Sequence, residues 1–385
     1  MDYKKFVKIW LYTIVIGICG IFAISTIVDP IDLLGMPILK GINNNKDRQQ
    51  DRFLDVFKPY QVVKYKPEVI FIGSSRVYYA LQAELDGYED EKVYNMGFSS
   101  LPFDNMEKYL DFVYKINKPQ KIFIGLDLFQ FGKDNFNNTK RNFSQTRLDK
   151  LSNCTDSEIL IESLKENFQV AYLTLGTMRH SFRQKDNLKI YERGWFASHG
   201  SRLEVNYEEY YNTINNFANI YRNWVYEEAS VIFLKRILEK ARQNNVDVYV
   251  FFNPISVDLI ALIKLSGLDD DLSQIKQEVV ELAGIVYDFN YINEFTTNRR
   301  ELFVDASHSN SKYGKVLKTD ILNGYDTERM LLLSKEDVCE KLEHESKLSQ
   351  EWFNNNKEYV TYLETEVINN HRKIENEELK NFIGF

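Results

Sequence analysis

Two short segments of this 385-residue chain hold side chains that can do chemistry together. The first is Gly73, Ser74, Ser75 and Arg76, which follows an apolar run and precedes a helical pattern. A serine that opens a helix lies beside unpaired amide donors and the positive end of the helix dipole. Such a place suits a nucleophile whose reaction passes through an oxyanion. Serine is also a favoured helix cap, so a purely structural role stays open.

The second segment places Asp305 three residues before His308. A neutral histidine can take a proton from a serine hydroxyl while an aspartate holds its tautomer and stabilises the imidazolium. We therefore predict that Ser75, Asp305 and His308 are catalytic. The alternatives are an aspartate that caps a turn beside a solvated histidine, or half of a metal site. No further cluster of ligands accompanies the pair at metal-binding spacing, so we expect neither a metal nor an organic cofactor.

Five apolar runs predict the strands that must position these residues. Each run is continuous rather than alternating, which is typical of strands buried on both faces of a parallel sheet. The runs cover residues 69–72, 93–95, 121–127, 246–253 and 284–288, with helical patterns at 104–117, 227–245 and 272–283. Alternating strands and helices predict an α/β fold with right-handed crossovers. Functional groups of such folds gather at the carboxyl ends of the strands.

The amino terminus carries the uncharged run 9–28. At 1.5 Å per residue, a helix of this length covers about 30 Å, one hydrocarbon core. Lysines at positions 4, 5 and 8 precede the run and Asp29 follows it, which predicts a cytoplasmic tail at 1–8, a membrane anchor at 9–28 and an extracytoplasmic remainder. A signal peptide cleaved near Ser25 is the main alternative. The reverse orientation, with a cytosolic domain, is disfavoured by the same lysines.

The rest of the chain divides into four predicted parts. Residues 29–65 form a polar connector, and residues 66–325 form the α/β domain. Residues 132–226 are a long helical insertion in that domain, which is typical of a lid or a partner surface. Residues 326–385 lack a strand-like run and predict a helical tail.

Charge and cysteine content exclude some classes of protein. The chain has 48 Lys and Arg against 56 Asp and Glu, a formal net charge of −8. A nucleic-acid partner is therefore not expected, because phosphate backbones require a dense basic face. Cys19, Cys154 and Cys339 are odd in number and far apart, which indicates neither a disulfide framework nor a zinc site.

Three blocks of the sequence resemble the SGNH/GDSL hydrolase family in their order and approximate separations. They are residues 73–75, residues 94–100 and the Asp305 to His308 segment. The resemblance covers residues 66–131 and 246–323, and it implies a three-layer, flavodoxin-like domain. More narrowly, the chain looks like the members that accompany membrane-bound O-acyltransferases in modifying bacterial surface polymers, such as those of alginate O-acetylation and lipoteichoic acid D-alanylation. The features that carry this resemblance are the anchor, the Gly-Ser-Ser-Arg variant at 73–76 in place of Gly-Asp-Ser, and residues 125–131.

The resemblance also implies roles for single residues. Ser75 matches the nucleophile, His308 its base and Asp305 the residue that orients the base. The backbone amides of Ser75 and Ser100 match the oxyanion hole. The family usually has glycine at the position of Ser100 and asparagine near Asp127, so these two positions depart from its pattern.

Further residues are predicted to shape the site. Asn95 and Gly97 either line the same pocket or form a tight turn after a buried strand. Arg76, Asp127 and Trp195 are candidates for binding substrate. The competing interpretations are that Arg76 pairs with a surface carboxylate or packs its stem, and that Trp195 is a structural aromatic residue in a folded lid.

Together these observations lead to two hypotheses of different class. The first is a membrane-anchored, extracytoplasmic enzyme, an O-acyltransferase or esterase, that acts on a cell-surface glycan or polyol polymer through an acyl-serine. A membrane-bound O-acyltransferase partner is implied by the resemblance. The second hypothesis is a catalytically silent, membrane-tethered scaffold that binds a polymer or such a partner.

Overall fold

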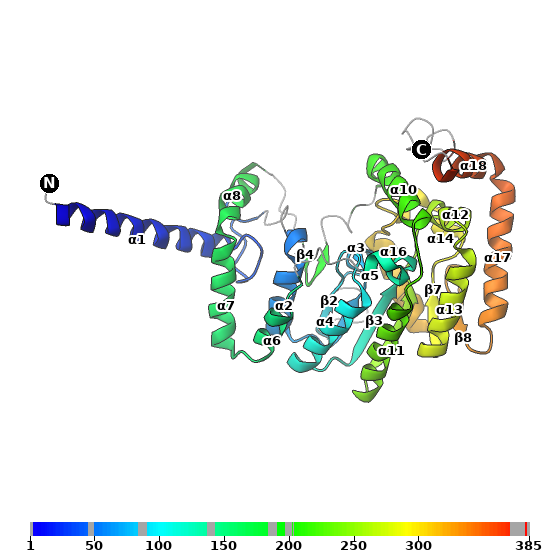
Figure 1. The fold of residues 1–385 in the computed structure, drawn as a ribbon, viewed down its shortest axis with the longest axis horizontal. Coiled ribbons are helices and arrows are strands. Elements are labelled where there is room, and N and C mark those ends of the chain that lie inside the picture. The colour runs from blue at the N-terminus through cyan, green and yellow to red at the C-terminus, as the bar shows by residue number, and fades with distance from the viewer. Residues whose placement is uncertain are drawn as a thin grey trace. The chain divides into compact units, whose positions relative to one another are not determined.

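The computed structural model describes residues 3–44, 50–83, 91–136, 143–183, 191–196, 202, 204–369 and 382 (Figure 1). Parts of the predicted insertion (137–142, 184–190, 197–201 and 203) and of the predicted tail (370–381 and 383–385) lie outside the described residues. The chain forms two compact units. Unit one comprises Met1–Tyr65 with Arg141–Ile190, and unit two comprises Lys66–Lys140 with Tyr191–Phe385. The predicted insertion is thus divided between the two units.

Unit one is helical. Its first helix, α1 (Tyr3–Val28), is long and apolar enough to span a membrane, as the sequence predicted from residues 9–28. The described part of unit one continues with η1 (Gln50–Phe53), α2 (Leu54–Tyr65), α6 (Gln145–Ser152), α7 (Asp156–Gln169), η3 (Ala171–Leu173) and α8 (Thr174–Arg183).

The carboxyl-terminal end of α1 is built into unit one. The Asn167 side chain donates to the Ser25 carbonyl at 2.9 Å, and the rings of Phe22 and Phe168 lie 5.8 Å apart. After the helix, the buried carboxylate of Asp29 accepts the amide of Leu33 at 2.9 Å. The contacts of Asn167 and Phe168 with α1 join the two segments of chain that make up the unit.

Unit two contains a six-stranded sheet with the order β2-β1-β3-β6-β7-β8. The first five of these strands pair in parallel, as predicted. Their bounds are β1 (Val69–Ile72), β2 (Val93–Asn95), β3 (Lys121–Leu126), β6 (Asp247–Phe252) and β7 (Ile285–Asp288). The short hairpin β4 (Tyr191–Glu192) and β5 (Trp195–Phe196) forms a separate antiparallel pair.

The sixth strand corrects the prediction that residues 326–385 are only helical. Strand β8 (Leu331–Ser334) pairs antiparallel with β7 at the edge of the sheet. Its side chains alternate between buried and half-buried, as suits an edge strand. Three consecutive leucines are too few for periodicity to separate a strand from a buried helical turn, so the sequence pattern missed it.

Side chains of the central strands are buried whichever face of the sheet they point to, so helices cover both faces. On one face, Phe71 and Phe123 pack edge to face at 5.2 Å in a core that includes Tyr313 of α16. On the other face, Ile70 and Ile122 are fully buried. The helices of unit two are α3 (Ser75–Ala80), α4 (Phe103–Ile116), α5 (Lys133–Phe136), α10 (Tyr207–Arg222), α11 (Glu228–Gln243), α12 (Val257–Leu265), α13 (Asp269–Ala283), α14 (Glu294–Thr297), α15 (Arg299–Leu302), α16 (Ser311–Asn323), α17 (Val338–Asn355) and α18 (Lys357–Tyr362), with the short turns η2 (Leu128–Phe131) and η4 (Leu363–Asn369).

A buried ion cluster holds α17 against the sheet. The ammonium of Lys276, on α13, lies 2.5 Å from Asp288 at the end of β7 and 2.6 Å from Glu345 on α17. Burial alone would lower the pKa of Lys276, but the two carboxylates raise it, so the lysine stays charged. Helix α17, from the predicted tail, is therefore fixed to α13 and to the end of β7 within unit two.

This cluster leads to a prediction about stability. Replacing Lys276 with Met leaves two buried carboxylates without their cation, and we expect the free energy of unfolding to fall by about 3–5 kcal/mol. Denaturant unfolding of the full chain in detergent measures the change. The control is Lys235→Met on α11, whose lysine is 58% exposed and 3.9 Å from Glu239, with an expected change within about 0.5 kcal/mol. Equal midpoints for the two variants would contradict the role given to Lys276.

Candidate active site

Ser75 lies at the carboxyl end of β1, at the first position of α3. The preceding residue, Ser74, is the helix cap, and its hydroxyl accepts the Arg76 amide at 3.1 Å. The turn between strand and helix passes so close to β3 that a Cβ atom on Gly73 would lie 2.6 Å from the Gly125 carbonyl oxygen. Glycine at position 73 therefore lets the chain turn tightly and present Ser75 at the edge of the sheet.

Asp305 and His308 belong to a loop that its own hydrogen bonds shape. The Val304 amide donates to the His308 carbonyl at 2.8 Å, which closes the loop. Inside it, one carboxylate oxygen of Asp305 accepts the amides of Ser307 at 2.7 Å and His308 at 2.9 Å. Burial alone would raise the pKa of Asp305, but the charge and hydrogen bond of His308 and the two amides lower it. The aspartate is thus held ionised.

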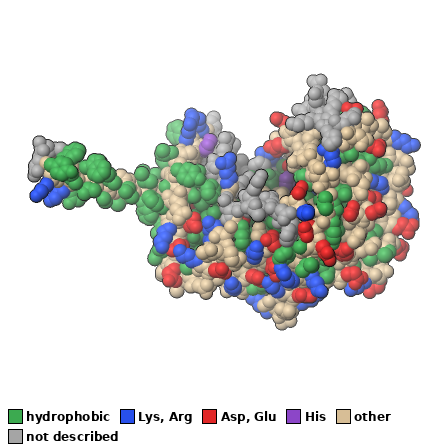
Figure 2. All heavy atoms as spheres, in the orientation of Figure 1, with side chains coloured by type: hydrophobic (Ala, Val, Ile, Leu, Met, Phe, Trp, Pro, Cys, Tyr) green, Lys and Arg blue, Asp and Glu red, His purple; other side chains and the backbone are tan. Residues whose placement is uncertain are grey.

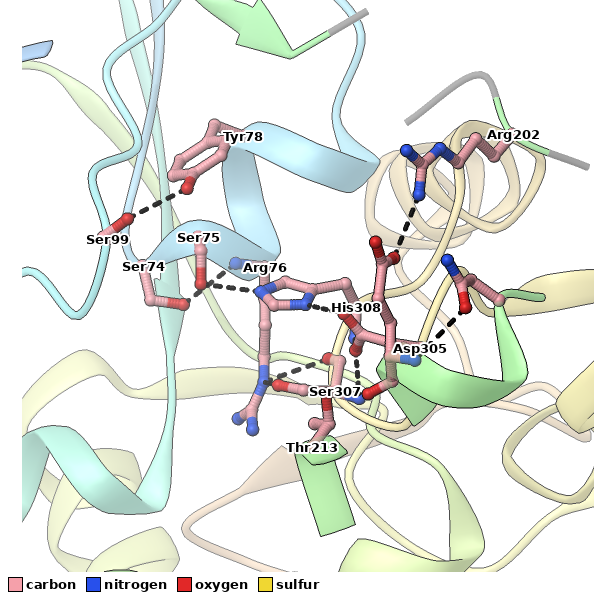
Figure 3. A network of polar contacts seen from close by, with 12 residues as sticks. Ser74, Ser75, Arg76, Tyr78, Ser99, Arg202, Thr213, Asp305, Ser307 and His308 are labelled. Carbon is pink, nitrogen blue, oxygen red and sulfur yellow. Dashed lines mark hydrogen bonds and ion pairs between the residues drawn. The ribbon is translucent and has the colours of Figure 1, made fainter. Parts of the chain in front are cut away.

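The structure brings the three predicted catalytic residues into one hydrogen-bonded line (Figure 3). His308 Nε2 lies 2.8 Å from Ser75 Oγ, and His308 Nδ1 lies 2.8 Å from Asp305 Oδ2. Because an ionised carboxylate only accepts hydrogen bonds, the proton of a neutral His308 belongs on Nδ1. Nε2 is then the acceptor that faces the serine hydroxyl. This is the arrangement that removes a proton from a serine as it attacks.

Tyr79 is a part of the site that the sequence analysis missed. Its ring stacks on the His308 imidazole, with 4.2 Å between ring centroids and 22° between planes. Tyr79 is four residues after Ser75 on α3, so both side chains lie on the same face of that helix. That spacing is the sequence signal that points to Tyr79. The stacked ring restricts the rotation of the imidazole.

Arg76 does not lie where a substrate could reach it. Its side chain is only 2% exposed, and Nη1 lies 2.5 Å from the buried carboxylate of Asp127, which follows β3. Its Nε donates to the Ser307 hydroxyl at 3.0 Å (Figure 3). The guanidinium carbon lies 5.2 Å from the centre of the Phe129 ring and 5.1 Å from the centre of the Phe217 ring. Arg76 thus pairs with a carboxylate inside the domain and not with a surface carboxylate, and these contacts do not support the prediction that it binds substrate.

The other two substrate-binding candidates are also inside. Asp127 is completely buried and accepts Asn253 Nδ2 at 3.2 Å as well as Arg76. Trp195, on β5, is 4% exposed, and its indole donates to the Tyr79 carbonyl at 2.9 Å. Trp195 thus supports α3, the helix that begins at Ser75, in agreement with the structural interpretation of this residue.

Asn95 and Gly97 support α3 from the neighbouring strand. The Asn95 amide donates to the carbonyls of Val77 at 3.0 Å and Leu81 at 2.8 Å, and its oxygen accepts the Gly97 amide at 2.8 Å. A Cβ atom on Gly97 would lie 2.9 Å from the Tyr78 amide nitrogen. These contacts match the interpretation as a tight turn rather than a pocket lining.

Ser100 is half-buried and has a φ of 44°. This left-handed conformation is the one that glycine adopts most easily. It therefore fits the glycine that the SGNH/GDSL family usually has at the corresponding position. The described residues contain no cluster of three or more His, Cys, Asp or Glu side chains arranged to hold a metal ion.

Comparisons with known proteins leave the family of this chain open. No protein-family model matches the chain, and no curated protein matches it. The geometry of Ser75, Asp305 and His308 is therefore the main support for any proposal about function.

The Arg76 and Asp127 pair leads to a prediction of coupled stability. We expect Arg76→Met alone to lower the free energy of unfolding by about 3–5 kcal/mol, because Asp127 stays buried without its cation. The double change Arg76→Met with Asp127→Leu removes both charges and is expected to recover most of that loss. Denaturant unfolding of the four proteins of the cycle measures the coupling. Additive effects of the two single changes would contradict it.

Asp305 leads to a prediction about pH. Its pKa in the folded protein is lowered below the unfolded value of about 3.9, so its stabilising contribution is fully present above about pH 5. The contribution is lost as the pH falls through the folded pKa. We expect the difference in unfolding free energy between the native chain and Asp305→Asn to shrink below about pH 4. Unfolding of both proteins across this range measures it, and a difference that stays constant down to about pH 3 would contradict the assignment.

Proposed function

We propose that this chain is a membrane-anchored, serine-dependent enzyme that transfers or hydrolyses acyl esters. One observation carries the proposal, the line from Ser75 Oγ through His308 to Asp305 with both hydrogen bonds at 2.8 Å. The nucleophile lies at the carboxyl end of a parallel strand, where active sites of open α/β sheets are found. The partial exposure of Ser75 leaves its hydroxyl within reach of a substrate.

The proposed chemistry has two steps. In the first, Ser75 Oγ bonds to the carbonyl carbon of an acyl ester, and its proton passes to His308 Nε2 while Asp305 stabilises the imidazolium. The ester bond then breaks, and the leaving alcohol takes that proton, which gives an acyl-serine. In the second step a hydroxyl of the acceptor attacks the carbonyl carbon of the acyl-serine and gives its proton to His308 Nε2. The bond between that carbon and Ser75 Oγ then breaks, and Ser75 Oγ takes the proton from His308, which restores the serine hydroxyl. Water as the acceptor makes the same site an esterase.

The oxyanion of each step needs hydrogen-bond donors. As the first residue of α3, Ser75 has an amide that no carbonyl of the helix can accept, so we assign it as one donor. The Ser100 amide is our second candidate. The Gly97 amide is engaged by Asn95, and Asp127 stands where the family has an asparagine donor. Loss of one such donor costs about 100- to 1000-fold in a well-studied protease, so we expect a slow enzyme.

The strand order supports the assignment to the SGNH/GDSL family. When the five parallel strands are counted along the chain, their order in the sheet is 2-1-3-4-5, the flavodoxin-like order. The serine after the first strand and the histidine after the last agree with the order of the family's blocks. The three-layer SGNH architecture is part of this proposal.

The location and substrate class belong to the same proposal. We assign α1 as a retained anchor with its lysine-rich end in the cytoplasm and the remainder outside. The contacts between Ser25 and Asn167 support retention, because cleavage near Ser25 would cut through a packed part of unit one. From the resemblance, the acceptor is a cell-surface glycan or polyol polymer, and a membrane-bound O-acyltransferase is the partner that supplies the acyl group.

A second candidate function is a silent scaffold tethered to the membrane. The observation that favours it is the loss of the side-chain donor, since Asp127 is committed to a buried ion pair. A site that holds a serine nucleophile but stabilises its oxyanion poorly would bind a polymer or a partner without turning it over.

Serine-reactive probes separate these two functions. We expect a fluorophosphonate to add one label to the full chain in detergent, and p-nitrophenyl acetate to leave one acetyl group on it. Ser75→Ala is expected to abolish both adducts, and His308→Ala is expected to slow them by at least about 100-fold. Intact-mass analysis over time measures the adducts. The control Ser99→Ala removes a more exposed hydroxyl nearby and is expected to change nothing.

The contrary result is equally specific. If the folded chain gains no adduct that depends on Ser75, with or without membranes that contain a candidate acyltransferase, the catalytic proposal fails and the scaffold is favoured.

A further inference from the structure

Unit one carries a set of large apolar side chains on its outside, which we call the apolar face. Its members come from α7, η3 and α8 and are between 40% and 83% exposed. They are Leu160, Ile161, Phe168, Tyr172, Leu175 and Phe182. A contiguous set of this kind is rare on a protein surface that faces water.

Helix α8 buries polar side chains and exposes large apolar ones, together with two arginines. It buries Thr174, Thr177 and Ser181, whereas Leu175 is 77% and Phe182 is 83% exposed. A helix that packs on a water-soluble core shows the opposite arrangement.

Helix α7 also exposes large apolar side chains. It buries Ser163 and Asn167 together with Ile159, and it exposes Ile161 and Phe168 beside charged residues such as Lys165. Large apolar side chains exposed on two neighbouring helices indicate that part of the medium outside them is apolar.

The apolar face continues from the end of the membrane-spanning candidate α1. Phe168, a member of the face, contacts Phe22 of α1, and the backbone of α1 at Ser25 is bonded to Asn167 of α7. Figure 2 shows apolar side chains that run along α1 and continue onto unit one where the helix ends. In Figure 1, α7 and α8 lie across this end of α1. The bilayer that would surround α1 is thus the nearest apolar medium.

The depth of this contact fits an interfacial position. Phe22 is six residues before Val28, the last residue of α1, which places it about 9 Å inside the span. Amphipathic helices at membrane interfaces bury their apolar face about 5–10 Å into the same zone. Arg179 and Arg183 are exposed on α8, where they can meet lipid phosphates, and Tyr172 suits the headgroup region.

We propose that α7 and α8 lie in the membrane interface beside α1, with the apolar face inserted among the lipids. The inference rests on the anchor assigned under the proposed function. The proposal adds a second membrane contact, which is made by residues more than 130 positions after the anchor begins. It also assigns the lipid surface as the partner of the middle of the predicted insertion. A partner protein or a second copy of the chain on the same face is the competing occupant.

Fluorescence quenching in lipid tests the proposal on the full chain. The three cysteines are replaced with serine, and single sites Leu175→Cys and Phe182→Cys are labelled with an environment-sensitive dye. Each protein is placed in vesicles of phosphatidylcholine and phosphatidylglycerol that contain nitroxide lipids. Ile232→Cys is the matched control, because Ile232 is a 51% exposed apolar residue on α11 of unit two. A chain that keeps only Cys19, exposed on α1, reports on the anchor.

We expect the dyes at positions 175 and 182 to shift to shorter wavelength and to lose fluorescence with shallow nitroxides more than with deep ones. Position 232 should behave as in water, and Cys19 should be quenched. If the dyes at positions 175 and 182 behave like the dye at position 232 while Cys19 is quenched, the interfacial contact is overturned and the anchor assignment stands. This holds whatever protein then covers the apolar face. A Cys19 that is not quenched would overturn both the anchor and this inference. Labelling of Ser75 is a separate readout, so the catalytic proposal stands or falls independently.

Discussion

The buried pair of Arg76 and Asp127 is the interaction on which the candidate site depends. Arg76 is adjacent to the serine, and the same guanidinium that pairs with Asp127 also bonds Ser307, next to the histidine. One side chain therefore joins the turn after β1, the end of β3 and the loop that carries Asp305. A guanidinium suits this task because its planar set of donors can serve several acceptors in fixed directions.

Buried carboxylates paired with a basic side chain recur elsewhere in unit two. Asp258, on α12, is completely buried and accepts two bonds from Arg299 at 2.7 and 2.8 Å. The hydroxyl of Tyr359 on α18 also donates to it, at 2.7 Å. Lys276 plays the corresponding part for α17. Buried charges require partners of good geometry, so each cluster fixes the position of helices that come late in the chain.

Much of the sheet could be predicted because its signal is local. The runs that became β1 and β3 are short, continuous and apolar, and strands of a covered parallel sheet need that composition. The spacing of Asp305 and His308 predicted their hydrogen bond for the same reason, since both residues belong to one loop.

What the sequence analysis missed depends on distant pairs. Nothing near Arg76 indicates that it pairs with a residue 51 positions later, and the stacking of Tyr79 on His308 joins two different segments. The strand β8 is recognisable only through its partner β7. Division of the insertion between two units likewise follows from contacts with α1, which lies more than a hundred residues earlier.

The discontinuous build of unit one has a consequence for biosynthesis. Ser25 and Asn167 are 142 positions apart, and the first three strands of unit two lie between them in the chain. At translation rates of roughly 5–20 residues per second, the ribosome needs on the order of 10 s to travel from one to the other. During that interval the end of α1 lacks its contacts with Asn167 and Phe168, while strands of unit two are already emerging. Completion of unit one therefore waits for chain that is made after three of the six strands of the sheet in unit two.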